Sequence, residues 1–325
     1  MGLDTNGIRL LIKAKELGVN FEKVITIGRQ NLNLKEKEMN DLLIKAGLFN
    51  EDAKKIFSQH GNGMNPHSKG NFRVYSESFF NLLGASVTDS MDVSDYEGAT
   101  VIQDLNKPMG DLKKKYTLVL DGGSLEHVFN FPVAIKNCMD LIEKNGYYIG
   151  ITPSNNFFGH GFYQFSPELY FRVFNESNGF KVIKMFFFID KKGTPIYELL
   201  DPLDLRTRST MVNSAPTYLF IIAQKTEEKV VFEKTPQQSD YEGIGWVKGS
   251  YGLPTTVNHK PFTPEWVKKL VPAPLKVLLY YLIKKIRHIF RFFKRIIIQP
   301  LKQYYKIHTT PTGSINPTFI KKTEE

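Results

Sequence analysis

The feature that most constrains the fold is an alternation of strand and helix patterns through residues 8–224. Short apolar runs predict strands, and apolar residues spaced three to four apart predict the helices between them. Strands are expected at residues 23–27, 85–91, 100–103, 116–120, 147–151, 181–189 and 217–224. Because helices separate most of these strands, the sheet is expected to be mainly parallel and covered on both faces. No clear helix pattern separates the last two strands, which are therefore expected to form an antiparallel edge.

Charge is distributed unevenly along the 325 residues. The chain has 43 Lys plus Arg and 33 Asp plus Glu, a formal net charge of +10. Residues 1–264 contain 30 basic and 30 acidic residues, whereas residues 265–325 contain 13 basic and 3 acidic residues. The whole excess therefore belongs to the last 61 residues. A uniformly basic protein that coats nucleic acid is disfavoured, and no specific nucleic acid partner is expected.

The cysteine content and the N-terminal residues favour a cytoplasmic location. Cys138 is the only cysteine, so the sequence allows neither an intrachain disulfide nor a thiolate metal cluster. Residues 1–6 lack the basic start and apolar run of a signal peptide. No apolar run reaches the length of about 18 residues that a membrane-spanning helix needs.

Residues that follow a strand are the first candidates for chemistry, because ligands of open α/β sheets bind beyond the carboxyl ends of the strands. Four predicted strands end in glycines, acids or both. Their ends read Gly28-Arg29-Gln30, Asp92, Asp104-Leu105 and Asp121-Gly122-Gly123-Ser124-Leu125-Glu126-His127-Val128.

In order and spacing, these strand ends resemble those of the class I S-adenosylmethionine-dependent methyltransferases. The sequence looks especially like small-molecule, methyltransferase type 11-like proteins with Leu-Glu-His-Val after the fourth strand, here residues 125–128. The resemblance covers about residues 20–225. It implies a doubly wound, mainly parallel, seven-stranded Rossmann-like sheet with an antiparallel last strand. It also implies S-adenosyl-L-methionine as the cofactor and methyl transfer to a small molecule or carbohydrate.

Under this resemblance, the acids after the second and third strands would hold the nucleoside. Asp92 would accept hydrogen bonds from both ribose hydroxyls, with Asp89 as the weaker candidate. Asp104 would accept a hydrogen bond from the adenine amino group, beside an apolar wall formed by Leu105. Asp92 and Asp104 also fit a structural alternative, because aspartate often caps the turn after a strand.

The first and fourth strand ends would hold the methionine part of the cofactor. Gly28 lets the backbone approach the ligand closely, and Arg29 follows it. The methionine end, which favours negative or carbonyl-lined surroundings, would be lined by Asp121, Gly122 and Gly123. The family's usual first loop has an acid and several spaced glycines, whereas this chain has Gly28-Arg29-Gln30. A methyltransferase-like domain that lost this loop and acts as a binding or scaffold protein at the membrane is therefore the alternative.

The acceptor side is expected in residues 152–165, which are rich in asparagine, glycine and aromatic residues. Such a composition suits a shaped loop over a small ligand. His160 and His127 are the natural bases, because imidazole titrates near neutral pH; a His127 satisfied by the backbone is the alternative. Tyr163 is a further catalytic candidate. The residues expected to contact the acceptor are Asn156, Tyr163, Arg206 and Arg208.

No dedicated metal site is expected. Some relatives bind a divalent ion through a Glu-x-x-Glu-His core, and Glu126 and His127 match its end. The position of the first acid is Gly123, which leaves the site short of a carboxylate even with His160 as a ligand.

The basic excess lies in a segment with helical periodicity. In residues 273–298, lysines and arginines recur every three to four residues, and isoleucines and phenylalanines fill the intervals. One cationic and one apolar face favour an interfacial helix on an anionic membrane surface, through residues 274–305. A helix docked on the body or in an oligomer contact, and binding of a polyanion, remain open.

The predicted organisation follows from these patterns. Residues 1–226 are expected to form the methyltransferase-like domain and residues 227–264 a Pro/Gly-rich connection. Residues 265–307 are expected to form a basic amphipathic helical segment, and residues 308–325 a tail. The protein is expected to methylate a small molecule or a sugar of a surface-polysaccharide pathway, peripherally at the inner face of the cell membrane.

Overall fold

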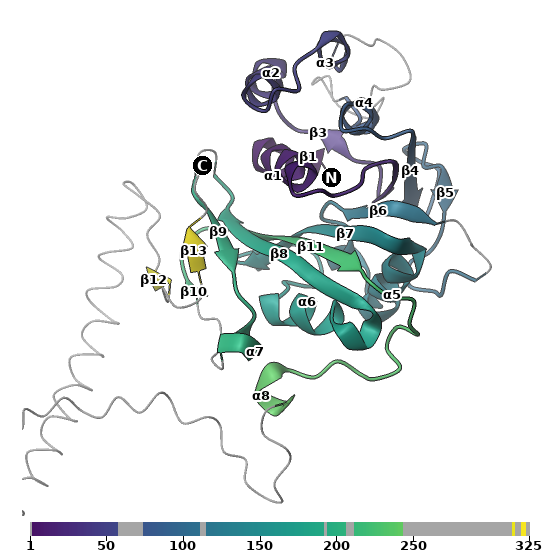
Figure 1. Ribbon diagram of the computed structural model, residues 1–325, viewed down its shortest axis with the longest axis vertical. Coiled ribbons are helices and arrows are strands. Elements are labelled where there is room, and N and C mark those ends of the chain that lie inside the picture. The colour runs from purple at the N-terminus through teal and green to yellow at the C-terminus, as the bar shows by residue number, and fades with distance from the viewer. Residues whose placement is uncertain are drawn as a thin grey trace, which may run out of the picture. The chain divides into compact units, whose positions relative to one another are not determined.

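The computed structural model describes residues 2–57, 74–110, 115–191, 194–205, 211–242, 314–315 and 320–322 (Figure 1). The chain divides into two compact units. The first comprises Met1–Thr210, Ala215–Glu242 and Asn316–Glu325, and the second Met211–Ser214 and Gly243–Ile315. In the second unit, the described strands β10 (Met211–Val212) and β12 (Ser314–Ile315) pair antiparallel. The predicted segment 265–307 lies outside the described residues, and the predicted domain boundaries stay predictions.

A nine-stranded sheet in the order β13-β9-β8-β11-β7-β6-β2-β4-β5 forms the centre of the first unit. Its strands are β2 (Lys23–Ile27), β4 (Val87–Asp92), β5 (Val101–Ile102), β6 (Tyr116–Asp121), β7 (Ile142–Asn155), β8 (Phe180–Ile189), β9 (Ile196–Leu199), β11 (Thr217–Lys225) and β13 (Ile320–Lys322). Each pairing among β2, β4, β5, β6 and β7 is parallel, whereas β11 is antiparallel to both neighbours. The predicted Rossmann-like α/β fold with an antiparallel last strand is confirmed.

Two details of the sheet differ from the prediction. Seven strands were expected, and β9 and β13 add two more beyond β8. Both are short and carry charged residues, so their sequences lack a clear apolar period. In addition, β11 lies inside the sheet and not at its edge. Residues Leu219 to Ala223 are buried without a break, as expected for a strand with neighbours on both sides and both faces covered.

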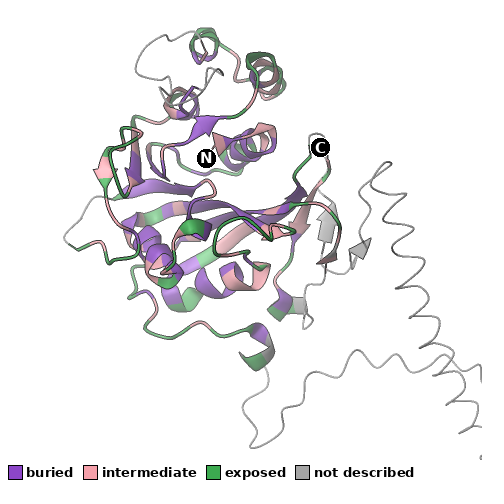
Figure 2. Ribbon diagram, turned by 180° about the vertical axis from the view of Figure 1, so that it is seen from behind, coloured by how far each residue is buried: buried purple, intermediate pink, exposed green. Residues whose placement is uncertain are grey.

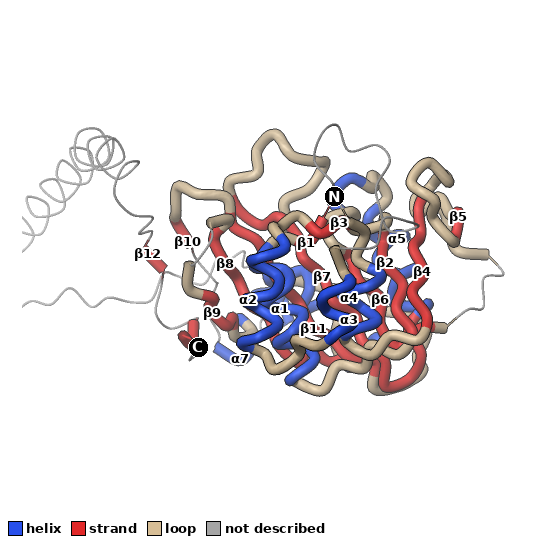
Figure 3. Tube along the Cα trace, turned by 90° about the horizontal axis from the view of Figure 1, so that it is seen from above, coloured by secondary structure: helices blue, strands red, loops and turns tan. Residues whose placement is uncertain are grey.

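Helices cover both faces of the sheet. On one face lie α1 (Thr5–Glu16), α2 (Glu36–Lys45), α3 (Glu51–Lys55) and α4 (Glu77–Leu82), which stand in front of the strands in Figure 3. The other face is covered by α5 (Phe131–Leu141) and α6 (Pro167–Val173). The remaining elements are β1 (Gly2–Leu3), β3 (Asn31–Leu32), α7 (Pro202–Leu205), α8 (Ser239–Glu242) and the 3₁₀ turns η1 (Leu125–His127) and η2 (Glu176–Asn178).

The first helix shows how local sequence leads to packing. The Asp4 carboxylate accepts a hydrogen bond of 2.7 Å from the Gly7 amide, which satisfies one of the unpaired donors at the start of α1. The apolar face of α1, with Ile8 and Leu11, is fully buried in one cluster with Phe220 of β11. Buried residues follow α1 and the sheet strands in Figure 2, and this core fixes the strand ends that form the candidate site.

Phe220→Ala is expected to cost about 3–5 kcal/mol of unfolding free energy, because it removes a fully buried ring from the centre of the sheet. Phe158→Ala is the matched control, since the Phe158 side chain is completely exposed. Urea denaturation of both variants and the wild type measures the difference. Similar losses for the two variants would contradict this description of the core.

Candidate functional site

The predicted strand ends lie at one edge of the sheet. Because β2, β4, β5 and β6 are parallel, their carboxyl ends meet there. The Gly28 amide donates to the Met91 carbonyl at 2.7 Å, and the Gln103 amide donates to the Asp92 carbonyl at 2.8 Å. From β2 the chain proceeds to β4 and β5 on one side and to β6 and β7 on the other. The strand order thus reverses between the neighbouring strands β2 and β6. Ligands of such sheets usually bind beyond the carboxyl ends of the strands at this point.

The loop that follows β2 and the loop that follows β6 are in close contact. Gly28 has a φ of 68°, and the buried Gln30 side chain lies between the loops. A Cβ atom on Gly122 would stand 2.5 Å from Gln30 Oε1, so only glycine fits there. Gly123 has a φ of 87°. Gly28, Gly122 and Gly123 therefore lie on two loops in contact, and binding of the methionine end there stays a prediction.

Arg29 is held by protein groups. Its Nε donates to Glu77 Oε1 at 2.6 Å, its Nη1 donates to the Glu97 carbonyl at 2.9 Å, and its guanidinium lies 3.8 Å from the centre of the Tyr75 ring. These contacts join the end of β2 to α4 and to the loop after β4. A contact between Arg29 and a cofactor stays a prediction.

The two candidate ribose acids have different surroundings. Asp89 accepts hydrogen bonds from the Tyr116 hydroxyl at 2.8 Å and from Thr100 Oγ1 at 2.9 Å, so it links β4 to the start of β6 and to the residue before β5. Asp92 is half-buried at the end of β4, and its Oδ1 accepts a hydrogen bond of 2.7 Å from the following amide, that of Val93. Of the two, Asp92 lies at the carboxyl end of β4, the side of the sheet where ligands of such folds usually bind.

Asp104 caps its own turn, as the structural alternative proposed. Its Oδ1 accepts from the backbone and side-chain amides of Asn106, both at 3.0 Å, and its Oδ2 lies 3.3 Å from Lys107 Nζ. Hydrogen bonds from Asn106 and Lys107 hold the pKa of Asp104 below its usual value. Leu105 is buried beside it. The turn is thus well fixed, and recognition of an adenine amino group by Asp104 stays a prediction.

Asp121 is fully buried at the end of β6. Its Oδ1 accepts from the amides of Ser124 at 2.8 Å and Leu125 at 3.3 Å, and the Tyr148 hydroxyl donates to its Oδ2 at 3.4 Å. Burial raises the pKa of Asp121 to about 6, although these hydrogen bonds oppose the shift. Asp121 therefore fixes the start of η1, which carries the next candidates.

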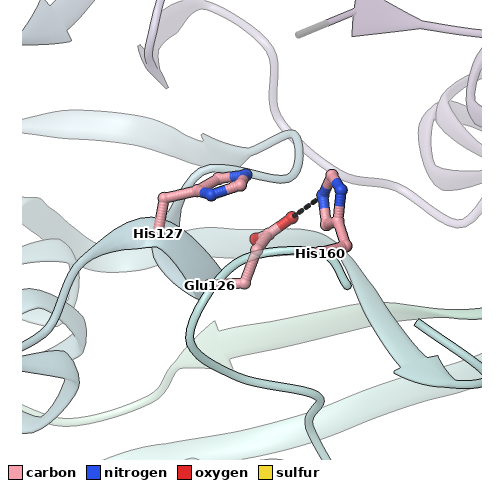
Figure 4. Close-up of side chains that lie close together, drawn as sticks. All are labelled: Glu126, His127 and His160. Atoms are coloured by element: carbon pink, nitrogen blue, oxygen red, sulfur yellow. Dashed lines mark ion pairs between the residues drawn. The ribbon is translucent and has the colours of Figure 1, made fainter. Parts of the chain in front are cut away.

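Glu126, which the sequence analysis considered only as part of a metal-binding pattern, is a further functional candidate. It is 1% exposed, and its Oε1 lies 3.5 Å from Nε2 of the half-exposed His160, with the two side chains pointing toward one another (Figure 4). Its other oxygen has no hydrogen-bond partner in the described part of the chain. Burial, followed by the nearby Asp121 charge, raises the pKa of Glu126 to about 8. A buried carboxyl that can bind or release a proton near neutral pH thus contacts an imidazole at the surface.

His127 stands beside this pair. Its ring centre lies 4.9 Å from that of His160, with the rings edge to face. Burial and the neighbouring His160 lower the pKa of His127, so its neutral form is favoured. The structure therefore brings together the two predicted bases.

The acceptor-side loop is fastened to η1. The amides of Phe162 and Tyr163 both donate to the Glu126 carbonyl, at 2.8 and 3.3 Å. Gly161 has a φ of 67°, and a Cβ atom there would lie 2.8 Å from the same carbonyl, so this close approach requires glycine. The first residues of the predicted loop, 152–155, belong to β7 instead.

The structure describes two of the four residues predicted to contact the acceptor. The Tyr163 hydroxyl donates to the Phe129 carbonyl at 2.6 Å, and Asn156 Nδ2 donates to the Ala215 carbonyl at 2.8 Å. Both side chains therefore shape the loop region, and contacts with an acceptor stay predictions. Arg206 and Arg208 lie outside the described residues.

Three phenylalanines near the histidines expose their rings. Phe129 is 72%, Phe158 100% and Phe162 66% exposed. The Phe129 and Phe162 rings pack edge to face, with their centres 5.7 Å apart. The Phe129 and Phe162 rings thus form an exposed apolar pair, and the Phe162 amide contacts the Glu126 carbonyl.

Glu126, His127 and His160 each offer one metal-ligand atom, and these atoms lie within 4.8 Å of one another. Ligands around a tetrahedral zinc ion lie about 3.4 Å apart, given bonds of about 2.1 Å. The present spread is wider, so metal binding would require the side chains to rearrange. That the protein lacks a dedicated metal site stays a prediction.

No family model and no curated protein sequence matches the chain. Among solved structures, the chain is similar to magnesium protoporphyrin IX methyltransferase from Synechocystis with bound S-adenosylhomocysteine. The identity is 12% and the TM-score 0.32, over 68% of this chain and 83% of that one. A SAM-dependent methyltransferase from Thermotoga maritima gives 10% and 0.36 over 69% and 91%, and an rRNA methylase from Streptococcus thermophilus gives 8% and 0.32 over 67% and 95%. Because these values are low, an activity has to be assigned from this chain's own residues.

Glu126→Gln is expected to stabilise the protein at high pH. Folding raises the pKa of Glu126 from 4.5 to about 8, so the folded state retains a proton that the unfolded chain releases. Wild-type stability therefore falls as the pH rises from 4.5 to about 8, and the neutral amide avoids this loss. The gain should be on the order of 5 kcal/mol larger at pH 9 than at pH 4.

Thermal and urea denaturation at the two pH values measure this gain. Glu36→Gln, at an exposed position of α2, is the control for the change of charge. A Glu126→Gln effect that is the same at both pH values would show that Glu126 ionises normally.

Proposed function

We propose that this chain is an S-adenosylmethionine-dependent methyltransferase that acts on a small molecule or a sugar. One observation carries the proposal. Gly28, Asp92 and Asp121 lie at the carboxyl ends of β2, β4 and β6, where the strand order reverses, and Glu126 follows on η1 with His160 from the loop after β7 beside it. A nucleoside site and a proton-accepting group would thus lie on neighbouring loops of one sheet edge.

The residues at this edge fit the cofactor. Gly28 has a φ of 68°, and the Gly122 backbone packs against the Gln30 side chain, whose Oε1 has no hydrogen-bond partner among the described residues. Asp92 would accept hydrogen bonds from the ribose hydroxyls, and Leu105 would provide an apolar wall for adenine. When bound, the cofactor supplies an electrophilic methyl group on a sulfonium.

The chain's own residues would align the acceptor and remove its proton. When Glu126 is ionised, its carboxylate accepts the Nε2–H of His160, which leaves Nδ1 of the same ring as the base. The lowered pKa of His127 favours its neutral form, so no second positive charge would lie beside His160 after His160 accepts the proton. The exposed rings of Phe129 and Phe162 would contact apolar parts of the acceptor.

The location of the protein is the finer part of the proposal. The charge excess of residues 265–325 and the two-faced pattern of residues 274–305 support peripheral binding to an anionic membrane surface. An acceptor from a surface-polysaccharide pathway would be available at the inner face of that membrane. Among the described residues, no helix combines the length and apolar character needed to cross a bilayer.

Isothermal titration calorimetry with S-adenosylhomocysteine tests the cofactor. We expect the wild type to bind it, and Asp92→Asn to weaken binding about tenfold or more, because a charge-assisted hydrogen bond to the ribose contributes about 1.5–3 kcal/mol. Asp140→Asn is the matched control, since Asp140 lies on α5 and pairs with Lys136. No heat and no thermal shift at millimolar ligand would refute methyl transfer and leave the non-catalytic scaffold.

Flotation with liposomes that contain anionic lipids tests the location. The full chain is expected to float, and an internal deletion of residues 274–305 to remain at the bottom of the gradient. Flotation should also fall as salt is raised, because the attraction is electrostatic. Equal flotation of the deleted protein would contradict the membrane assignment.

A further inference from the structure

The segment that follows β2, residues 28–32, is held by extended chain on two sides. On one side β3 pairs parallel with β1. On the other side the Leu32 amide donates to the Val74 carbonyl at 2.8 Å. This second contact brings the neighbouring Tyr75 to the side chain of Arg29. Arg29 therefore projects from a fixed backbone.

The Arg29 side chain connects this segment to the loop of residues 93–98 after β4. It is 19% exposed, and its Nε donates to Glu77 Oε1 at 2.6 Å. The guanidinium lies 3.8 Å from the centre of the Tyr75 ring, and its Nη1 donates to the Glu97 carbonyl at 2.9 Å. An arginine can hold all three groups at once, because its planar guanidinium offers several donors in a fixed geometry and a face for an aromatic ring.

The far end of the loop packs closely on Arg29. A Cβ atom on Gly98 would lie 3.0 Å from Arg29 Nη1, and the φ of Gly98 is 72°. Both the backbone conformation and the close guanidinium therefore favour glycine at this position. The Gly98 amide donates to the Asp95 carbonyl at 2.8 Å, which makes this end of the loop a tight turn.

The near end of the same loop begins at Asp92. The Asp92 Oδ1 accepts a hydrogen bond of 2.7 Å from the Val93 amide, so the first peptide of the loop sets the direction of the carboxylate. Residues 93–96 are exposed, so packing contributes little to holding them. The contact between Arg29 and Glu97 therefore limits how far the loop, and with it the Val93 amide, can move.

We propose that Arg29 is a positioning residue of the cofactor site, which fixes the loop of residues 93–98 and through it the direction of the Asp92 carboxylate. This inference rests on the proposed function, in which Asp92 accepts hydrogen bonds from the ribose hydroxyls. Arg29 acts without touching the ligand, because its guanidinium is engaged by the side chains of Tyr75 and Glu77.

The first test is a calorimetric cycle with two ligands and two proteins. The ligands are S-adenosylhomocysteine and its 2′,3′-dideoxy analogue, in which hydrogen replaces both ribose hydroxyls. The proteins are the wild type and Arg29→Met, which keeps a long side chain without the guanidinium. We expect Arg29→Met to weaken S-adenosylhomocysteine about fivefold or more and to leave the affinity for the analogue unchanged, because only the hydroxyls depend on Asp92.

Hydrogen exchange of the ligand-free protein gives a second readout that needs no cofactor. The amides of residues 93–98 are expected to exchange faster in Arg29→Met than in the wild type, because the loop opens more often without its anchor. The amides of α5 are expected to exchange at the same rate in both proteins.

Arg9→Met is the matched control for both experiments. Arg9 is a partly buried arginine of α1, so the substitution removes the same group from another element. This variant is expected to bind both ligands, and to exchange the amides of residues 93–98, as the wild type does.

The outcomes separate the two proposals. Equal affinity of wild type and Arg29→Met for S-adenosylhomocysteine, or unchanged exchange of residues 93–98, would overturn the role of Arg29 and leave the proposed function intact. An equal loss for both ligands would also overturn it, because Arg29 would then act on another part of the ligand. A wild type that binds neither ligand would refute the proposed function, and this inference with it.

A second variant covers the case in which Arg29→Met does not fold. Arg29→Lys keeps a positive charge beside Glu77, but an ammonium group lacks the planar fork that holds both Glu77 and the Glu97 carbonyl. It is therefore expected to show the same selective loss of affinity for S-adenosylhomocysteine. Wild-type affinity of Arg29→Lys for both ligands would overturn the inference.

Discussion

The candidate site depends on one buried carboxylate at the end of β6. Asp121 is stabilised there by amide donors from the start of η1, and these bonds set the position of the turn. This turn places the Glu126 side chain beside His160. The Glu126 carbonyl holds the acceptor-side loop by accepting hydrogen bonds from the amides of Phe162 and Tyr163. Two acids buried close together also disfavour each other's ionisation, which keeps protons available beneath a surface imidazole.

The fold could be predicted because its signals are local. Each parallel strand has a short apolar run, each helix has its own period, and the sequence between them is long enough for a crossover. The two strands of the central sheet that were missed, β9 and β13, are too short to show a period. They form only because β8 provides an edge on which β9 pairs, and β13 then pairs with β9. The interior position of β11 was also missed, because pairing order is a tertiary property that a strand pattern does not contain.

The site was predictable only in part for the same reason. The positions of Gly28, Asp92 and Asp121 at the ligand edge follow from where strands end. Glu126 contacts His160 and Gln30 packs against Gly122, and both neighbours are distant in the sequence, so a sequence pattern shows neither contact. Both residues are polar and follow a strand, a pattern that ordinarily indicates exposure. Their burial is what distinguishes them.

The pairing of β13 with β9 changes how the basic segment is connected. Ile320 to Lys322 belong to the same sheet as the candidate site, so the chain leaves the first unit at residue 243 and belongs to it again from residue 316. Residues 243–315 are thus an insertion in the sequence of the first unit, connected to it at both ends. Any surface that this insertion binds would be connected to the first unit through both ends of the insertion, and removing everything after residue 264 would take β13 from the sheet as well.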